Sequence, residues 1–290
     1  MKKNIFIGIL LIACLTQGAS AAEKTVRVRE NKSGIISTYP LEDYVAAVLA
    51  AEMPEEFPPE ALKAQAVLIR TLTQNPSQDH RLQGFDFCDT THCQLFRPLK
   101  TIPEKFRIAT LQTRGQILSY NHKPIVALYH STCGGHTSAN QRVFGGEPQP
   151  YLQGVDDKDY CEASPQTTWR SQVPRRQLEA VLAFSPLKQI QVLDGEAQGR
   201  NFTLALEGRD RKDLSAQDFL LAVGQQIGWE KIKSAYFTVE PNGDAFTFIG
   251  RGLGHGVGLC QWGARGMALQ GKTYREILQH YFPGTYLDEK

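Results

Sequence analysis

The sequence lacks a strong charge of either sign. Its 290 residues include 32 lysine and arginine side chains against 30 aspartate and glutamate side chains, for a formal net charge of +2. Proteins that bind nucleic acid usually present a dense positive surface, which this balance does not indicate. We therefore expect no nucleic-acid partner, although the charge is compatible with a mild affinity for anionic polymers.

The sequence also lacks several common catalytic motifs. It contains no G-x-S-x-G, no H-E-x-x-H and no G-x-G-x-x-G unit between a strand and a helix. These absences argue against a serine-triad hydrolase, a zinc protease of the H-E-x-x-H type and a dinucleotide-binding enzyme. The pair of carboxylates that most glycoside hydrolases use is not evident either.

Long hydrophobic runs are scarce, and the one that is present lies at residues 5–15. It follows a short basic start and precedes small residues that fit an A-x-A cleavage site, so residues 1–22 are predicted to be a signal peptide. The run is too short to span a bilayer. We expect an exported protein on the periplasmic or cell-wall side of the membrane. The alternative is a lipid anchor at Cys14, which fits a lipobox less well.

Cysteine is uncommon, and the number left after the signal peptide is odd. The remaining cysteines are Cys88, Cys93, Cys133, Cys161 and Cys260. An odd number in an exported protein excludes complete pairing into disulfides within the chain, so some of these thiols must be free or bind metal.

One loop combines two of these cysteines with two histidines. Cys88, His92 and Cys93 form a C-x3-H-C cluster, and His80 lies eight residues upstream of it. Two thiols and two imidazoles are a common tetrahedral zinc set, so these four residues are predicted to bind zinc. The alternative is a Cys88–Cys93 disulfide with two bystander histidines.

A second cluster lies in the segment YHSTCGGHT, with His130, Cys133 and His136, and with Cys161 further along the chain. We favour a Cys133–Cys161 disulfide that fixes the intervening loop, although metal binding is also open here. His130, at the end of a predicted strand, is expected to face a cleft.

Hydrophobic periodicity and turn signals predict an α+β fold, with one domain over residues 23–290, because regular βαβ alternation is absent. Residues 75–100 and 134–170 are predicted to be long loops, and the first is long enough to suggest a function. Helices are predicted at 41–53, 59–72, 215–228, 263–269 and 274–282, and strands at 24–30, 187–194, 201–208 and on both sides of turns at 121–122 and 242–243.

Glu52 occupies a position where a helix would normally place an apolar residue. It follows Leu41, Val45 and Val48 at spacings of four, three and four, so all lie on one helical stripe. Burial and the negative end of the helix dipole both disfavour its ionised form. We therefore predict a carboxyl that stays protonated near neutral pH, as a general acid must. The alternative is a glutamate that simply reaches solvent at the end of a helix.

A glycine-rich loop near the C-terminus is the other candidate for a site. Seven glycines lie between Gly250 and Gly266, with His255 among them and Gln261 after it. Glycines at this density allow positive φ angles and the close approach of a ligand. His255 and Gln261 are therefore candidates to contact substrate, and the alternative is a tight turn around a packed histidine.

Five sequence blocks occur in an order that resembles the SpoIID/LytB family, that of stage II sporulation protein D. They are AAEMPEEFPPEALKAQAVLIRT, CDTTHCQLF, YHSTCGGHT, PYLQGV and GRGLGHGVGLCQWGARGMA with ILQHYFPGT after it, and the likeness extends from about Pro40 to Thr285. The resemblance implies one catalytic domain with a glycan-binding cleft. It also implies a peptidoglycan lytic transglycosylase that cuts MurNAc–GlcNAc bonds and leaves 1,6-anhydro-MurNAc ends, with a preference for strands without stem peptides.

In this family the catalytic acid is the glutamate of the AAEMP block, which is Glu52 here. Such a reaction needs no cofactor, and zinc at the cysteine loop would be structural. The cationic pair Lys63 and Arg70, together with the His255 loop, are candidates to orient the glycan or to stabilise Glu52. The family also contains amidase enhancers. The alternative function is therefore a non-catalytic protein that binds peptidoglycan and activates an N-acetylmuramoyl-L-alanine amidase.

Overall fold

The computed structural model describes residues 23–76, 78–98, 101–197 and 199–289. The predicted signal peptide and Cys14 lie outside this part of the chain. Helices and strands are mixed without regular alternation, which confirms the α+β prediction. Among the described residues, no helix combines the length and the hydrophobicity that crossing a bilayer requires.

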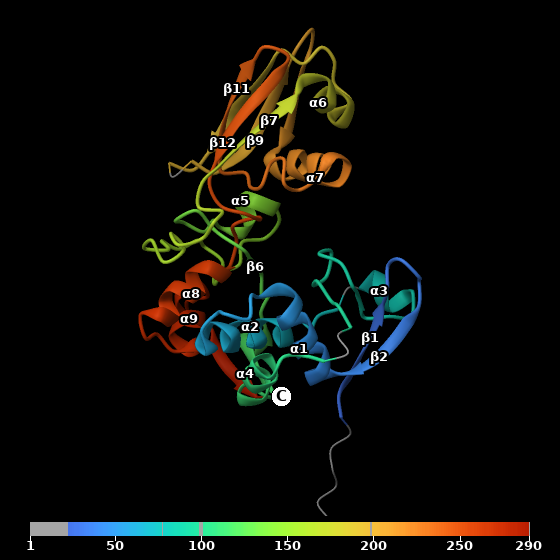
Figure 1. Ribbon diagram of the computed structural model, residues 1–290, viewed down its shortest axis with the longest axis vertical. Helices are drawn as coiled ribbons and strands as arrows, with labels where there is room; N and C mark the ends of the chain where they lie inside the picture. Colours follow the sequence, from blue (N-terminus) through green and yellow to red (C-terminus); the bar gives the residue numbers. More distant parts are fainter. Residues whose placement is uncertain (1–22, 77, 99–100, 198, 290) are drawn as a thin grey trace, which may run out of the picture.

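The buried hydrophobic residues form two separate clusters, which correspond to two lobes in Figure 1. We call residues 23–161 and 251–289 the first lobe, and residues 169–250 the second lobe. The chain thus leaves the first lobe, builds the second and returns. The prediction of a single domain stays a prediction, and the hydrophobic core within it has two parts.

The first lobe holds most of the helices. Its elements are β1 (Thr25–Arg29), β2 (Ile36–Pro40), α1 (Leu41–Glu52), α2 (Pro59–Leu72), α3 (Gln78–Leu82), β3 (Phe87–Cys88), α4 (Glu104–Gln112), β4 (Gln116–Tyr120), β5 (Lys123–Pro124), β6 (Tyr129–His130), α5 (Asn140–Phe144), β13 (Leu259–Cys260), α8 (Gln261–Leu269), α9 (Tyr274–Tyr281) and β14 (Tyr286–Glu289). The strands form three small sheets in the orders β2-β1-β3, β14-β4-β5 and β13-β6.

The second lobe consists of two three-stranded antiparallel sheets and two helices. Its elements are β7 (Trp169–Pro174), α6 (Arg175–Leu182), β8 (Gln189–Gly195), β9 (Asn201–Glu207), β10 (Arg211–Ser215), α7 (Ala216–Ile227), β11 (Phe237–Asn242) and β12 (Ala245–Gly250). The sheet orders are β10-β9-β8 and β11-β12-β7.

Most predicted elements are present, with a few differences. The turn at Asn121-His122 is confirmed, and both residues have positive φ, as a two-residue hairpin turn requires. The pairing of Asn242 with Ala245 places the second hairpin turn one residue later than predicted. The predicted loop 75–100 contains α3 and β3, and the loop 134–170 contains α5. These pieces are too short to give a periodic signal of their own.

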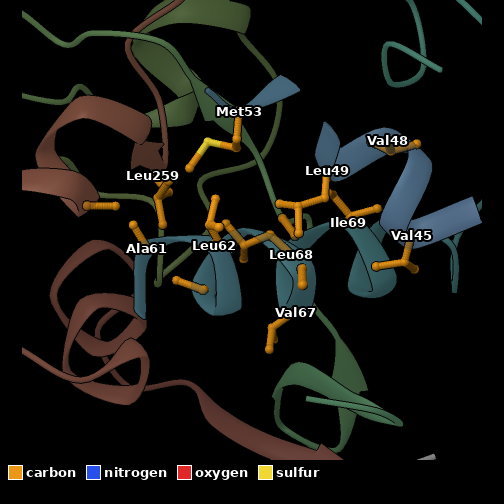
Figure 2. Packing of buried hydrophobic residues seen from close by; sticks show 14 of the residues in the cluster. Val45, Val48, Leu49, Met53, Ala61, Leu62, Val67, Leu68, Ile69 and Leu259 are labelled. Carbon is orange, nitrogen blue, oxygen red and sulfur yellow. The ribbon is translucent and has the colours of Figure 1, made fainter. Parts of the chain in front are cut away.

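The core of the first lobe is built around α1 and α2, whose apolar side chains interdigitate in Figure 2. Leu49 of α1 and Ile69 of α2 are fully buried. The buried residues of α1 are not limited to the predicted stripe, because Tyr44, Ala46 and Ala47 are buried as well. A helix that is apolar on nearly all sides lies inside a protein. This burial places Glu52, the last residue of α1, next to the interior of the lobe.

Candidate active site

Glu52 receives hydrogen bonds from three segments that are distant in the sequence. Its Oε1 accepts a 2.9 Å hydrogen bond from the backbone N–H of Leu95, in the loop after β3. The hydroxyl of Tyr129, on β6, lies 3.4 Å from the same oxygen. The side chain of Gln261, the first residue of α8, also hydrogen-bonds Glu52. The carboxyl therefore has a fixed orientation, and its side chain is half-buried.

The pKa of Glu52 is raised above the ordinary value for glutamate. Burial raises it, because a charged carboxylate loses hydration in this position, and the three hydrogen bonds oppose the shift by stabilising the charged form. Burial is the larger effect. A carboxyl held in this way retains its proton to a higher pH than an exposed glutamate and can donate it to a leaving group.

Three side chains that the sequence analysis did not select extend the polar network around Glu52. Tyr129 lies 3.3 Å from the Oε1 of Gln94, whose Nε2 lies 3.4 Å from the hydroxyl of Tyr44. Burial raises the pKa of both phenols, so they remain protonated donors. Tyr129 adjoins His130 in a short strand, and alternation along a strand turns neighbouring side chains to opposite faces. This alternation implies that Tyr129 and His130 face opposite sides of the strand, so the sequence did hold a signal that only one of the two can face Glu52.

The four predicted zinc ligands lie together. His80 Nε2 is 3.2 Å from Cys93 Sγ, and Cys93 Sγ is 3.4 Å from Cys88 Sγ. His92 Nδ1 is 3.7 Å from Cys88 Sγ and 3.6 Å from Cys93 Sγ. Zinc–ligand bonds of about 2.0–2.3 Å in tetrahedral geometry place neighbouring ligand atoms about 3.3–3.8 Å apart. The residues therefore fit one zinc ion, and the presence of zinc itself stays a prediction.

The two sulfurs in this cluster are thiols, not a disulfide. Burial opposes ionisation of Cys88, but hydrogen bonds that involve Thr90, Cys93 and His92 lower its pKa to about 7. A thiol that ionises readily is suited to bind metal. Cys93 is followed directly by Gln94 and Leu95, so whatever fixes this cluster also fixes the N–H that binds Glu52.

His130 does not face a cleft as predicted, because its side chain is only 5% exposed. Its Nδ1 donates to the carbonyl of Val257, at 3.2 Å. His255, by contrast, uses both ring nitrogens on backbone groups. Nε2 donates to the carbonyl of Tyr129 at 2.9 Å, and Nδ1 accepts from the N–H of Val257 at 3.1 Å. The contacts of His255 match the packed-histidine alternative, and its direct role in binding substrate stays a prediction.

His255 is expected to make stability depend on pH. Burial lowers its pKa to about 4, from 6.5. The unfolded chain therefore takes up a proton first, and the stability that His255 contributes is complete above pH 6.5 and lost as the pH falls to about 4. His255→Gln, whose amide can reproduce one donor and one acceptor, should weaken this acid sensitivity. Urea denaturation of both proteins from pH 4 to pH 7 would measure it, and identical pH profiles would contradict the assignment.

Lys63 and Arg70 both form ion pairs within the first lobe. Lys63 Nζ lies 2.6 Å from Glu60 in the same helix. Arg70 is 1% exposed. Its guanidinium donates to both carboxylate oxygens of Glu42 on α1, to Oε1 at 2.9 Å and to Oε2 at 2.7 Å. Its guanidinium also donates to backbone carbonyls of α4 and β4. These contacts correct the prediction that Arg70 binds substrate: it joins four elements of the core instead.

We expect Arg70→Met to destabilise the protein by about 3–5 kcal/mol, because it leaves the partly buried Glu42 carboxylate and two carbonyls without their cation. Lys63→Met is the matched control, and loss of its more exposed pair should cost at most about 1 kcal/mol. Chemical denaturation of the two variants makes the comparison. An Arg70→Met protein of normal stability that binds glycan poorly would restore the substrate-binding role.

Gln261 is the predicted substrate-binding residue that the structure brings to Glu52. The predicted cleft beside Glu52 stays a prediction. A cavity of about 330 Å³ lies elsewhere, mainly on the second lobe, where Tyr236, Thr238 and Ile249 are among the residues that line it.

The segment that holds Glu52 and the cysteine loop is also the segment that a family model matches. The model described as stage II sporulation protein, SpoIID, matches residues 29–120. Stage II sporulation protein D of Bacillus subtilis (strain 168) is 32% identical over 287 residues, which cover 93% of this chain and 80% of that protein. The protein of the same name from Bacillus amyloliquefaciens is 30% identical over 296 residues, with coverages of 94% and 83%. An amidase enhancer of Bacillus subtilis is 28% identical over 286 residues, which cover 83% of this chain and 39% of that protein.

Proposed function

Because this chain belongs to the SpoIID family, we propose that it is a peptidoglycan lytic transglycosylase in which Glu52 is the general acid and then the general base. Membership of the family gives the protein a function related to the cell wall. The finer assignment rests chiefly on one observation. Glu52 is a half-buried carboxyl with a raised pKa, and groups from three distant segments hold it in place.

The proposed reaction needs one carboxyl. Protonated Glu52 donates its proton to the O4 of the leaving sugar as the C1–O4 bond of the MurNAc breaks. The resulting carboxylate accepts the proton of the C6 hydroxyl, and O6 bonds to C1 of the same sugar, which gives the 1,6-anhydro end. No water takes part, so the second carboxylate of an ordinary glycoside hydrolase is not needed.

The neighbours of Glu52 suit these two roles. The Leu95 N–H and the Tyr129 hydroxyl both point at Oε1 and stabilise the carboxylate that forms after the first proton transfer. They leave Oε2 as the oxygen that carries the transferred proton. The side chains that contact Glu52 are a phenol and an amide, which do not compete with it as acids near neutral pH.

Zinc at His80, Cys88, His92 and Cys93 would be structural, because all four ligand positions belong to the protein. When bound, it would fix the loop that carries the Leu95 N–H. We propose denuded glycan strands as the substrate and the cell-wall side of the membrane as the location.

The amidase-enhancer relative supports a second candidate function. In that case the protein binds peptidoglycan and accelerates an N-acetylmuramoyl-L-alanine amidase, without cutting glycan itself. Mass spectrometry of denuded glycan incubated with the pure protein separates the two functions. Fragments with anhydro ends support the enzyme. Intact glycan, together with faster release of stem peptides when an amidase is added, supports the enhancer.

The pH dependence of glycan cleavage should report the acid form of Glu52. Because burial raises its pKa, kcat/KM should fall as the pH rises through a value above the ordinary 4.5. Tyr129→Phe removes a hydrogen bond that stabilises the carboxylate, so this pKa should rise further and the falling limb should move to higher pH. Rates measured across pH 4–9 for both proteins provide the check. If the falling limb of the pH–rate profile of Tyr129→Phe stays in place or moves to lower pH, Glu52 is not the titrating acid.

A further inference from the structure

A second cluster of metal-binding side chains lies in the interior of the first lobe. The ligand atoms of Cys133, Asp157, Cys161 and Cys260 all lie within 4.8 Å of one another, and all four residues are buried. They come from three segments: Cys133 follows β6, Asp157 and Cys161 lie between α5 and β7, and Cys260 ends β13. From the sequence, only Cys133 and Cys161 were predicted to lie together.

The predicted Cys133–Cys161 disulfide is not formed. The two sulfurs are 3.5 Å apart, and all three cysteines of the cluster are thiols. The sulfur of Cys260 lies as close to the other ligand atoms as theirs do to one another, within 4.8 Å. A disulfide between two of the cysteines would therefore leave the third buried sulfur unpaired beside it. The odd cysteine number agrees with a site that uses all three sulfurs together.

Backbone N–H groups point at these sulfurs. Cys133 Sγ accepts from Gly135 N at 3.3 Å, and Cys260 Sγ accepts from Cys133 N at 3.3 Å and from Gly263 N at 3.2 Å. A thiol sulfur is a weak acceptor, whereas a thiolate is a strong one, and charge-assisted hydrogen bonds are about twice as strong as neutral ones. These N–H groups favour negative charge on Cys133 and Cys260, while the carbonyl of Ser131, 3.6 Å from Cys260 Sγ, is a contact that suits a protonated thiol.

We propose that Cys133, Cys161, Cys260 and Asp157 bind a zinc ion, at a structural site separate from the one at the cysteine loop. Zinc–sulfur bonds of about 2.3 Å in a tetrahedron place two sulfurs about 3.8 Å apart, close to the separation of Cys133 and Cys161. Three soft thiolates and one carboxylate suit zinc rather than magnesium or calcium. The compact ligand set has room for one ion and not for a cluster of several irons.

Arg200 supports the site independently. This arginine is 1% exposed, and one terminal nitrogen donates to the carbonyls of Cys133 and His136, at 2.8 and 3.3 Å. Its Nε and other terminal nitrogen have no hydrogen-bond partner among the described residues. A buried cation needs nearby negative charge, which Glu196 supplies in part and the cysteine cluster can supply further. Three thiolates and a carboxylate around a divalent ion have a net charge of −2, which suits a neighbouring buried cation.

Groups around the ligands hold Asp157 in place. The hydroxyl of Tyr281 donates to Asp157 Oδ1, and the N–H of Cys161 donates to Asp157 Oδ2 at 2.9 Å. Gly263 lies so close to both Tyr281 and Asp157 that an added Cβ would overlap them. Contacts of this kind, around the ligands themselves, are typical of metal sites in proteins.

A metal ion at this site would fix the positions of β6 and β13, which lead to the side chains that bind Glu52. Cys260 pairs with His130 across β13 and β6 and is followed directly by Gln261, while Tyr129 lies on the same β6. An ion shared by Cys133 and Cys260 therefore fixes two of the three segments that bind Glu52. The inference does not depend on whether Glu52 cleaves glycan, because it concerns metal content.

Native mass spectrometry and elemental analysis of the full chain, purified without chelator, test the proposal. We expect two zinc ions per chain in the wild type. Cys161→Ser should lose one and keep the other, and Cys88→Ser, the matched control, should lose the opposite one. A single zinc that disappears in Cys88→Ser and persists in Cys161→Ser would overturn the second site. So would a metal-free cluster with a Cys133–Cys161 disulfide, seen as a mass lower by two hydrogens.

A second measurement applies if Cys161→Ser does not fold. Stepwise titration of the wild-type thiols with a mercurial reagent, with zinc release followed by a colorimetric chelator, needs no variant. Modification of all five thiols should release two zinc ions, the second only as the buried thiols react. Zinc release that is complete after the first two thiols react would overturn the proposal, and so would buried thiols that react without releasing zinc.

Discussion

Glu52→Gln is expected to lower the rate of glycan cleavage by at least about 10²–10⁴-fold, the usual contribution of a general acid–base group. The amide keeps the shape of the side chain and an oxygen that can accept from the Leu95 N–H and the Tyr129 hydroxyl. It removes only the proton that titrates. The fold should survive, because a neutral amide replaces a carboxyl whose charged form burial already disfavours.

The assay should separate cleavage from binding. Glu52→Gln protein should still sediment with denuded peptidoglycan but should release no anhydro-sugar. Glu56→Gln, an exposed acid four residues later, is the matched control and should cleave normally. If the protein is an amidase enhancer, Glu52→Gln should leave amidase stimulation nearly intact. Glycan cleavage near the wild-type rate by a well-folded Glu52→Gln protein would remove Glu52 from the mechanism.

Loss of the zinc at the cysteine loop should cause the second-largest fall in the rate of glycan cleavage. Cys93→Ser removes a ligand whose sulfur contacts His80, Cys88 and His92, and the loop would then no longer hold the Leu95 N–H against Glu52. We expect cleavage to fall at least about 10–100-fold, as when the support of a metal site is removed. The melting temperature should fall as well, since metal binding contributes to folding.

Thr91→Ala, an exposed position in the same loop that is not a predicted ligand, is the control and should retain zinc, activity and stability. The measurements are zinc content, thermal unfolding and release of anhydro-sugar. Wild-type protein that is metal-free, with Cys88 bonded to Cys93, would end the zinc hypothesis. Unchanged activity in zinc-free Cys93→Ser protein would instead show that the loop holds its position without metal.

The parts of the site that were predicted from sequence depend on local patterns. Helical spacing placed Glu52 at the end of α1, and close spacing along the chain grouped Cys88, His92 and Cys93. Such patterns involve residues near one another in the sequence, where geometry follows directly from the secondary structure.

The parts that were missed depend on contacts between distant segments. The sequence does not reveal that Arg70 pairs with Glu42, because a cation on a helix face is usually solvated. Nor does it reveal that Cys260 joins Cys133, 127 positions earlier. Tyr129 was passed over for its neighbour His130, since a histidine in a motif suggests chemistry more strongly than a tyrosine does. In each case, packing within the first lobe decided the role.

The return of the chain to the first lobe, visible in Figure 1, has a consequence for biosynthesis. Helix α2 packs against α8 and α9, which follow the whole second lobe in the sequence. Gln261 follows Glu52 by about 200 positions, so at about 5–20 residues per second the ribosome adds it roughly 10–40 s later. Until then the face of α2 that packs against α8 and α9 has no cover, whereas α4 and β4 can already cover other parts of α1 and α2. This face of α2 therefore waits for its partners for as long as the whole second lobe takes to be translated.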